Sequence, residues 1–127
     1  MFFAVIAASA QTEDKLYDGE IGDFKIKINI DFHAVVNTEI GDSVGYYYYD
    51  DRPNIKLTLR LKEFDEVMNE TSFRVSYHVI LNEYTPKGFN SGTFDGWISA
   101  LNNYSGTFKN SQSKEYDFTW DVMLSDE

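Results

Sequence analysis

Phe24-Lys-Ile-Lys-Ile-Asn-Ile-Asp-Phe32 is a nine-residue stretch in which apolar and polar residues alternate without a break. Successive side chains of a β-strand point to opposite faces, so such a stretch turns an apolar row toward a core and a polar row toward water. The same alternation returns at residues 55–62, 73–82 and 116–124. We therefore predict an all-β, antiparallel protein.

Short turn sequences separate the alternating stretches. Gly22-Asp23 is a tight-turn dipeptide, Asp51-Arg-Pro-Asn54 is a turn around a proline, and residues 110–113 join the last pair of strands. The eight expected strands are residues 16–21, 24–32, 43–50, 54–64, 72–84, 91–100, 104–109 and 114–124. Sequential hairpins of this kind predict a meander.

Glycines inside the expected strands favour a curved sheet. Tyr104-Ser-Gly106 echoes Tyr17-Asp-Gly19, and Ser91-Gly-Thr-Phe94 echoes Ser105-Gly-Thr-Phe108. A glycine within a strand usually marks a bulge or sharp bend, through which a sheet curls until its edges meet. We expect a small closed barrel, with a two-sheet β-sandwich as the alternative.

Residues 62–69 allow a second interpretation of the chain between two strands. Phe64, Val67 and Met68 fall at helical spacing, so this segment could close with a short helical turn instead of extended chain. No long helix is expected anywhere.

Bulky side chains dominate the apolar rows. The expected inward residues are Phe24, Ile26, Ile28, Ile30, Phe32, Ile55, Leu57, Leu59, Leu61, Phe73, Val75, Tyr77, Val79, Leu81, Tyr116, Phe118, Trp120, Val122 and Leu124. An eight-stranded barrel is just wide enough for such side chains, which predicts a filled interior. A small-molecule site should then lie at a barrel mouth, formed by loops such as residues 33–42 or 85–90.

Composition excludes several classes of function. The 127 residues suit a single domain, and the absence of cysteine excludes disulfides, thiol catalysis and cysteine-bound metal centres. A net charge of −10 disfavours nucleic acid as a partner. No stretch reaches the roughly 18 apolar residues of a membrane helix, so we expect no membrane insertion.

Residues 1–10 look like the remnant of a signal peptide. They are apolar or small and end in Ala8-Ser9-Ala10, the small-x-small pattern that signal peptidase requires. Cleavage there would leave Gln11 first, with residues 11–127 as the barrel domain. The segment is short and has no basic residue, so we expect the true start of the gene to lie upstream. We predict a soluble protein of the periplasm or extracellular space. The alternative interpretation of residues 1–10 is that they form a buried first strand.

A family resemblance rests on strand and turn signatures. They are Gly45-Tyr-Tyr-Tyr-Tyr49, Ile55-Lys-Leu57, Leu81-Asn-Glu83, Gly92-Thr-Phe-Asp-Gly96, and Gly106-Thr-Phe108 with Phe118. The chain resembles small exported β-barrel proteins of Bacteroidetes-type bacteria, and its second half has an avidin- or lipocalin-like strand pattern. A glycine expected soon after Leu59 is absent. The resemblance implies a fold and no reaction.

Four aromatic residues are our candidates for ligand binding. Alternation must turn two rings of the tetrad 46–49 outward, and we single out Tyr47 and Tyr49 from it. Trp97 should face away from Phe94, Gly96 and Ile98, where it could stack on a sugar or contact a protein. Phe89 lies in the loop at residues 85–90. The alternative is cross-strand aromatic pairing that only stiffens the sheet.

Catalysis finds little support in the sequence. His33 and His78 belong to no nucleophile or metal motif, and we expect both to be surface residues. Acidic pairs such as Asp50-Asp51 and Asp65-Glu66 could act in hydrolysis only if folding brought two carboxylates to a suitable separation. We predict no enzyme activity, no cofactor and no metal site.

The sequence therefore predicts an exported, non-enzymatic binding protein, a monomer or weak oligomer, that uses barrel-mouth loops and an aromatic outer face. Its partner would be a glycan, a small apolar ligand or a basic protein. Three alternatives stay open: an inhibitor of a basic exported enzyme such as lysozyme, an envelope accessory protein, and a carboxylate-dependent hydrolase.

Overall fold

The computed structural model describes residues 16–30, 35, 37–98 and 103–121. They form eight strands: β1 (Tyr17–Ile21), β2 (Phe24–Ile30), β3 (Ser43–Tyr49), β4 (Leu57–Met68), β5 (Val75–Tyr84), β6 (Asn90–Ile98), β7 (Asn103–Asn110) and β8 (Glu115–Asp121). The all-β prediction is confirmed, and each strand overlaps the stretch expected to form it.

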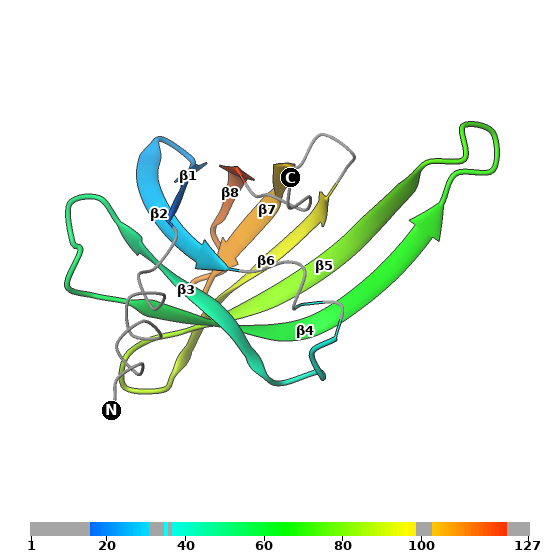
Figure 1. The fold of residues 1–127 in the computed structure, drawn as a ribbon. Helices are drawn as coiled ribbons and strands as arrows, with labels where there is room; N and C mark the ends of the chain where they lie inside the picture. Colours follow the sequence, from blue (N-terminus) through cyan, green and yellow to red (C-terminus); the bar gives the residue numbers. More distant parts are fainter. Residues whose placement is uncertain (1–15, 31–34, 36, 99–102, 122–127) are drawn as a thin grey trace, which may run out of the picture.

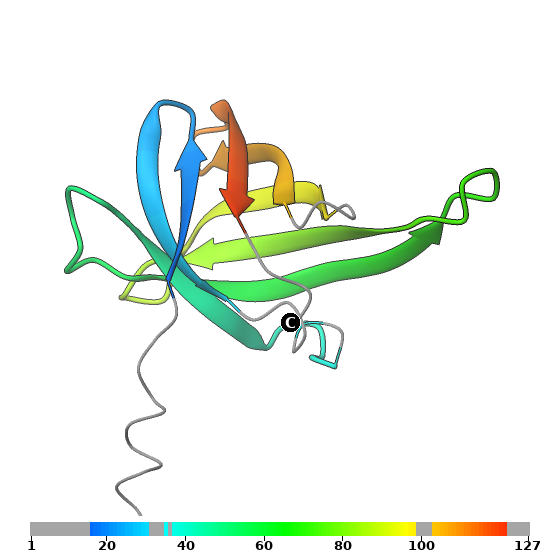
Figure 2. The same cartoon turned by 45° about the horizontal axis from the view of Figure 1, so that its top comes forward.

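Each strand pairs antiparallel with the next, and β1 returns to pair with β8 (Figure 1). The closing register sets Gly19 opposite Trp120 and Ile21 opposite Phe118. Figure 2 shows β1 between β2 and β8, with no edge left along this side. The meander is therefore a closed barrel, and the two-sheet sandwich is excluded.

The alternating rows fill the barrel. In β2, Ile26, Ile28 and Ile30 are buried, whereas Lys25 and Lys27 lie on the outside. The buried hydrophobic cluster consists of Ile21, Ile26, Ile28, Ile30, Val35, Tyr47, Leu59, Leu61, Val79, Leu81, Phe94, Ile98, Tyr104, Phe108, Phe118 and Trp120. Burying an aromatic or aliphatic side chain of this size contributes about 1.5–3 kcal/mol, so this cluster is the main source of stability.

The strand β4 runs beyond its predicted end at residue 64, and the helical-turn interpretation of residues 62–69 is wrong. A bulge between Leu61 and Glu63 shifts the register, so the inward row passes from Leu61 to Phe64. Val67 and Met68, whose spacing from Phe64 suggested the helical turn, are exposed residues of the strand. Phe64 stacks on Tyr77, with ring centroids 5.5 Å apart. Beyond it, β4 and β5 continue as a two-stranded arm that leaves the barrel (Figure 1).

Three residues that we expected inside are exposed. Phe24 lies at the barrel mouth, and Ile55 precedes β4, which begins only at Leu57. Phe73, 78% exposed, lies in the turn before β5 with a φ of 58°. In that turn the side-chain oxygen of Asn69 accepts hydrogen bonds from two backbone N–H groups, so the chain reverses before the alternation begins to face a core. Phe32, Val122 and Leu124 lie outside the described residues.

Nothing in the described part of the chain is a helix of the length and apolar character that crossing a membrane requires.

Gly45 marks the bulge in β3 that lets β2, β3 and β4 curve together. The register shifts between Ser43 and Gly45, whose φ is +155°. A Cβ added at Gly45 would lie 2.0 Å from the carbonyl oxygen of Asn29 on β2. Neighbouring backbones therefore approach here as closely as only glycine permits.

We predict that Gly45→Ala lowers the free energy of unfolding by roughly 1–3 kcal/mol or more, because β2 must move to admit the methyl group. Urea unfolding followed by tryptophan fluorescence measures the change. Ser43→Ala, an exposed position on the same strand, is the control and should leave stability nearly unchanged. Equal stability of the two variants would contradict this account of the bulge.

Candidate functional site

A pocket of about 410 Å³ opens at one end of the barrel, where the β1–β2, β3–β4, β5–β6 and β7–β8 connections lie. All eight strands and the β3–β4 connection contribute to it. The residues lining it are Ile21, Phe24, Tyr49, Asp51, Arg52, Leu57, Glu83, Ser91, Phe108, Asn110 and Tyr116. Because these residues lie at strand ends, the rigid barrel holds the pocket and no long loop is needed.

Glu83 is the charged residue of this pocket that lies deepest, with 5% of its surface exposed. Its position follows from the strand pattern, since Val79, Leu81 and Glu83 occupy one inward row of β5. The hydroxyl of Tyr47 donates a hydrogen bond to Oε2 of Glu83. The hydroxyl of Ser91 donates to Oε1 at 2.6 Å. Both carboxylate oxygens are therefore held in place, one from β3 across the barrel interior and one from the neighbouring β6.

The surroundings of Glu83 in the pocket change the pKa of its carboxyl group. Burial raises the pKa of Glu83 above its ordinary value, and the hydrogen bonds from Ser91 and Tyr47 partly offset this rise. Burial, together with the nearby charge of Glu83, holds the pKa of Tyr47 well above its usual range. The Tyr47 hydroxyl thus stays protonated at physiological pH and remains a donor.

Both donors to Glu83 are neutral hydroxyl groups. Among the described residues, no lysine, arginine or histidine forms an ion pair with Glu83. Arg52 also lines the pocket, but its Nε lies 3.8 Å from Asp51 Oδ1 and its side chain is mostly exposed. Glu83 is therefore a buried carboxylate without a protein counter-ion in the part of the chain that is described.

Aromatic rings form much of the wall. The ring of Tyr49 meets Phe24 edge to face at 6.1 Å and Tyr47 at 5.7 Å between centroids. Phe108 and Tyr116 line the side formed by β7 and β8. The pocket combines apolar ring surface with one buried carboxylate, so it can hold a small molecule that has both an apolar and a polar part.

The four candidate residues separate into two groups in space. Tyr47 is fully buried inside the barrel, and Tyr49 is half-buried at the mouth. Trp97, 46% exposed, faces away from the buried Phe94 and Ile98 as expected and stacks on His78 with ring centroids 4.7 Å apart. Phe89 is exposed in the β5–β6 connection, at the pocket end of the barrel.

The outward rings of the tyrosine tetrad are Tyr46 and Tyr48. The ammonium group of Lys56 lies 5.8 Å from the Tyr46 ring centroid and 5.1 Å from that of Tyr48. These two rings, on the outer face of β3, therefore already have a cation over them.

His78 and its neighbours form a small polar cluster on the outside of the barrel. The Nε2 atom of His78 lies 2.6 Å from Asp95 Oδ1. Within the described ranges, no three His, Asp or Glu side chains converge as a metal site would require. His33 lies outside the described residues.

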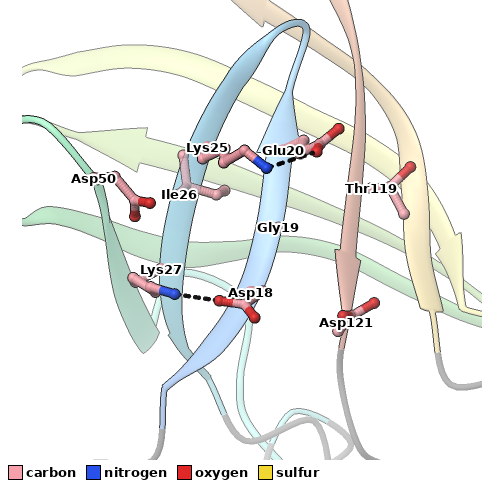
Figure 3. A pocket seen from close by; sticks show the side chains of 9 residues that line it. All are labelled: Asp18, Gly19, Glu20, Lys25, Ile26, Lys27, Asp50, Thr119 and Asp121. Atoms are coloured by element: carbon pink, nitrogen blue, oxygen red, sulfur yellow. Dashed lines mark hydrogen bonds and ion pairs between the residues drawn. The ribbon is translucent and has the colours of Figure 1, made fainter.

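A second hollow, of about 360 Å³, lies on the outer face of β1, β2 and β8 (Figure 3). Its side chains include two ion pairs, Lys27 with Asp18 and Lys25 with Glu20. Three of these four side chains are mostly exposed. Exposed pairs of this kind contribute little energy, and the hollow has no buried polar group to orient a ligand.

Our sequence analysis missed Glu83 and Ser91. The signal was present, because Glu83 continues the inward row of Val79 and Leu81 and so predicts a carboxylate facing the interior. The predicted mouth loop at residues 85–90 connects the two strands that carry Glu83 and Ser91. Of the predicted loop at 33–42, residues 33, 34 and 36 lie outside the described residues, and residues 37–42 lead into the end of β3 that is opposite the pocket.

Comparisons with known proteins found no match: no family model fits the sequence, and neither a curated protein nor a solved structure is similar to it. The resemblance to exported barrel proteins of Bacteroidetes-type bacteria therefore stays a prediction.

We predict that Glu83 contributes more to the stability of the protein in acid than at higher pH. Because its pKa is raised on folding, the folded state holds the proton more tightly than the unfolded chain. This contribution is complete below the unfolded pKa and is lost as the pH rises through the folded pKa. The stability of the wild type minus that of Glu83→Gln should thus fall as the pH rises from the ordinary pKa of a glutamate through the raised pKa of folded Glu83.

Urea unfolding of both proteins across that range measures the difference, in which the titration of all other groups cancels. A difference that stays constant or grows with pH would show that the pKa of Glu83 is not raised.

Proposed function

We propose that this chain is a non-enzymatic binding protein that holds a small ligand at the mouth of its barrel. The observation that carries the proposal is the pocket of about 410 Å³, which joins aromatic walls to a buried, hydrogen-bonded carboxylate. A pocket with a few convergent polar groups and a titratable residue of shifted pKa is the usual form of a ligand site.

The filled core supports a small ligand over a large one. Tyr47, Phe94 and Trp120 are fully buried and pack against one another beneath the mouth, with ring centroids of Tyr47 and Phe94 5.5 Å apart. A ligand therefore enters only as far as the level of Glu83. Small-molecule sites typically range from about 300 to 1,000 Å³, and this pocket lies at the lower end.

Tyr49 provides a test that separates the mouth from the outer face. We predict that Tyr49→Ala abolishes the ligand-induced rise in melting temperature, because the ring forms part of the pocket wall. Tyr48→Ala removes the neighbouring ring on the outside and is the matched control. Thermal-shift measurements should use disaccharides, small aromatic molecules and a basic lysozyme as probes.

A rise that survives in Tyr49→Ala and disappears in Tyr48→Ala or Trp97→Ala would move the binding site to the outer face. A rise with lysozyme alone would favour the inhibitor alternative.

A second candidate function is a carboxylate-dependent hydrolase, because Asp51 and Glu83 both line the pocket. A buried acid of raised pKa that shares a pocket with an exposed acid is the arrangement general-acid catalysis uses. Asp65 and Glu66 play no part in it, since they lie on the β4–β5 arm. Turnover of an aryl glycoside that Glu83→Gln abolishes would favour this function over simple binding.

We also propose export, which the small-x-small pattern at Ala8-Ser9-Ala10 supports. The protein purified from its native cells should begin at Gln11, as determined by N-terminal sequencing. A chain that keeps residues 1–10 would contradict both cleavage at this position and the signal-peptide interpretation.

A further inference from the structure

The surroundings of Glu83 indicate the sign of the charge that a ligand of the mouth pocket would carry. A carboxylate removed from water needs a counter-charge or a complete set of hydrogen bonds to remain ionised. The protein supplies two neutral donors, Tyr47 and Ser91, and, in the described part of the chain, no cation. Two donors do not use the full acceptor capacity of a carboxylate, and Glu83 lines the pocket. The missing component is a positive charge.

The aromatic walls of the pocket also favour a positively charged ligand. Tyr49, Tyr116, Phe24 and Phe108 bring four aromatic rings to one pocket, and the face of an aromatic ring attracts a cation. The chain itself shows this preference at two tyrosines, Tyr84 outside the pocket and Tyr116 in its wall. Arg60 lies 5.5 Å from the Tyr84 ring centroid, and Lys114 lies 5.4 Å from that of Tyr116.

Resting on the proposed binding function, we propose that the mouth pocket is a site for a small organic cation, an amine or alkylammonium, with Glu83 as its counter-ion. The ammonium group would lie against the Glu83 carboxylate, and the apolar part of the molecule would lie against the rings of Tyr49 and Tyr116. A net charge of −10 favours the approach of such a ligand.

The charges at the rim are compatible with this assignment. Arg52 already has the carboxylate of Asp51 within 3.8 Å, and both side chains are mostly exposed. Its charge is therefore screened by solvent and by its partner, whereas that of Glu83 is not. The titratable and charged groups around Glu83 are Tyr47, Tyr49, Asp51, Arg52, Lys114 and Tyr116.

Three probes of similar shape test the sign of the ligand charge: 2-phenylethylammonium, 2-phenylethanol and 3-phenylpropionate. Isothermal titration calorimetry on the full chain at neutral pH should show the cation binding roughly tenfold or more tightly than the alcohol. The anion should bind most weakly. In Glu83→Gln, which keeps the shape of the side chain, the preference for the cation over the alcohol should disappear.

Binding to the wild type at falling pH gives a second measurement that needs no variant. A proton on Glu83 removes the counter-charge, so the affinity for 2-phenylethylammonium should fall as the pH drops through the pKa of Glu83, while that for 2-phenylethanol should not. This comparison keeps the proposal testable if Glu83→Gln does not fold.

The outcomes separate this inference from the function on which it rests. Equal binding of cation and alcohol, or tighter binding of the anion, overturns the cation assignment and leaves a mouth site for another ligand class. If none of the three probes binds and the panel of other probes gives no shift that depends on Tyr49, the binding function itself falls, and the cation assignment with it.

Discussion

Pairing of β1 with β8 is the constraint on which the rest of the structure depends. It turns a meander into a barrel. Because a barrel of eight strands is narrow, the inward side chains of all strands pack against one another in its interior. Rings such as those of Phe94 and Trp120, with centroids 4.6 Å apart, then leave no room for a ligand at the centre. Space for another molecule remains only where the strands end.

At that end, the inward row of β5 offers a carboxylate where an apolar residue would complete the core. Burial of Glu83 costs free energy, and the protein recovers part of it through the hydroxyls of Tyr47 and Ser91. Two hydrogen bonds from separate strands hold the group in one orientation. A residue that stability alone would not select, held rigidly in a pocket, is what the proposed binding function accounts for.

Alternation in the sequence predicted eight strands, the meander and most of the core correctly, because period two reports directly which side chains share a face. It failed where the register shifts. The bulge after Leu61 moved the inward row to Phe64, and the arm of β4 and β5 was therefore missed. The pocket could not be foreseen, since Tyr49, Glu83 and Tyr116 lie on strands that only closure brings together. The tyrosine tetrad suggested a surface feature, but Tyr47 is instead a fully buried partner of Glu83.

The central claim is that this barrel works through its mouth and not through its outer face. Backbone amide signals in ¹H–¹⁵N NMR spectra, recorded while 2-phenylethylammonium is added, test it most directly. Our account predicts saturable shifts for Tyr49, Glu83, Ser91 and Tyr116, with Trp97 and Tyr48 unchanged. Shifts centred on Trp97 and Tyr48, with Glu83 and Ser91 unaffected, would contradict it.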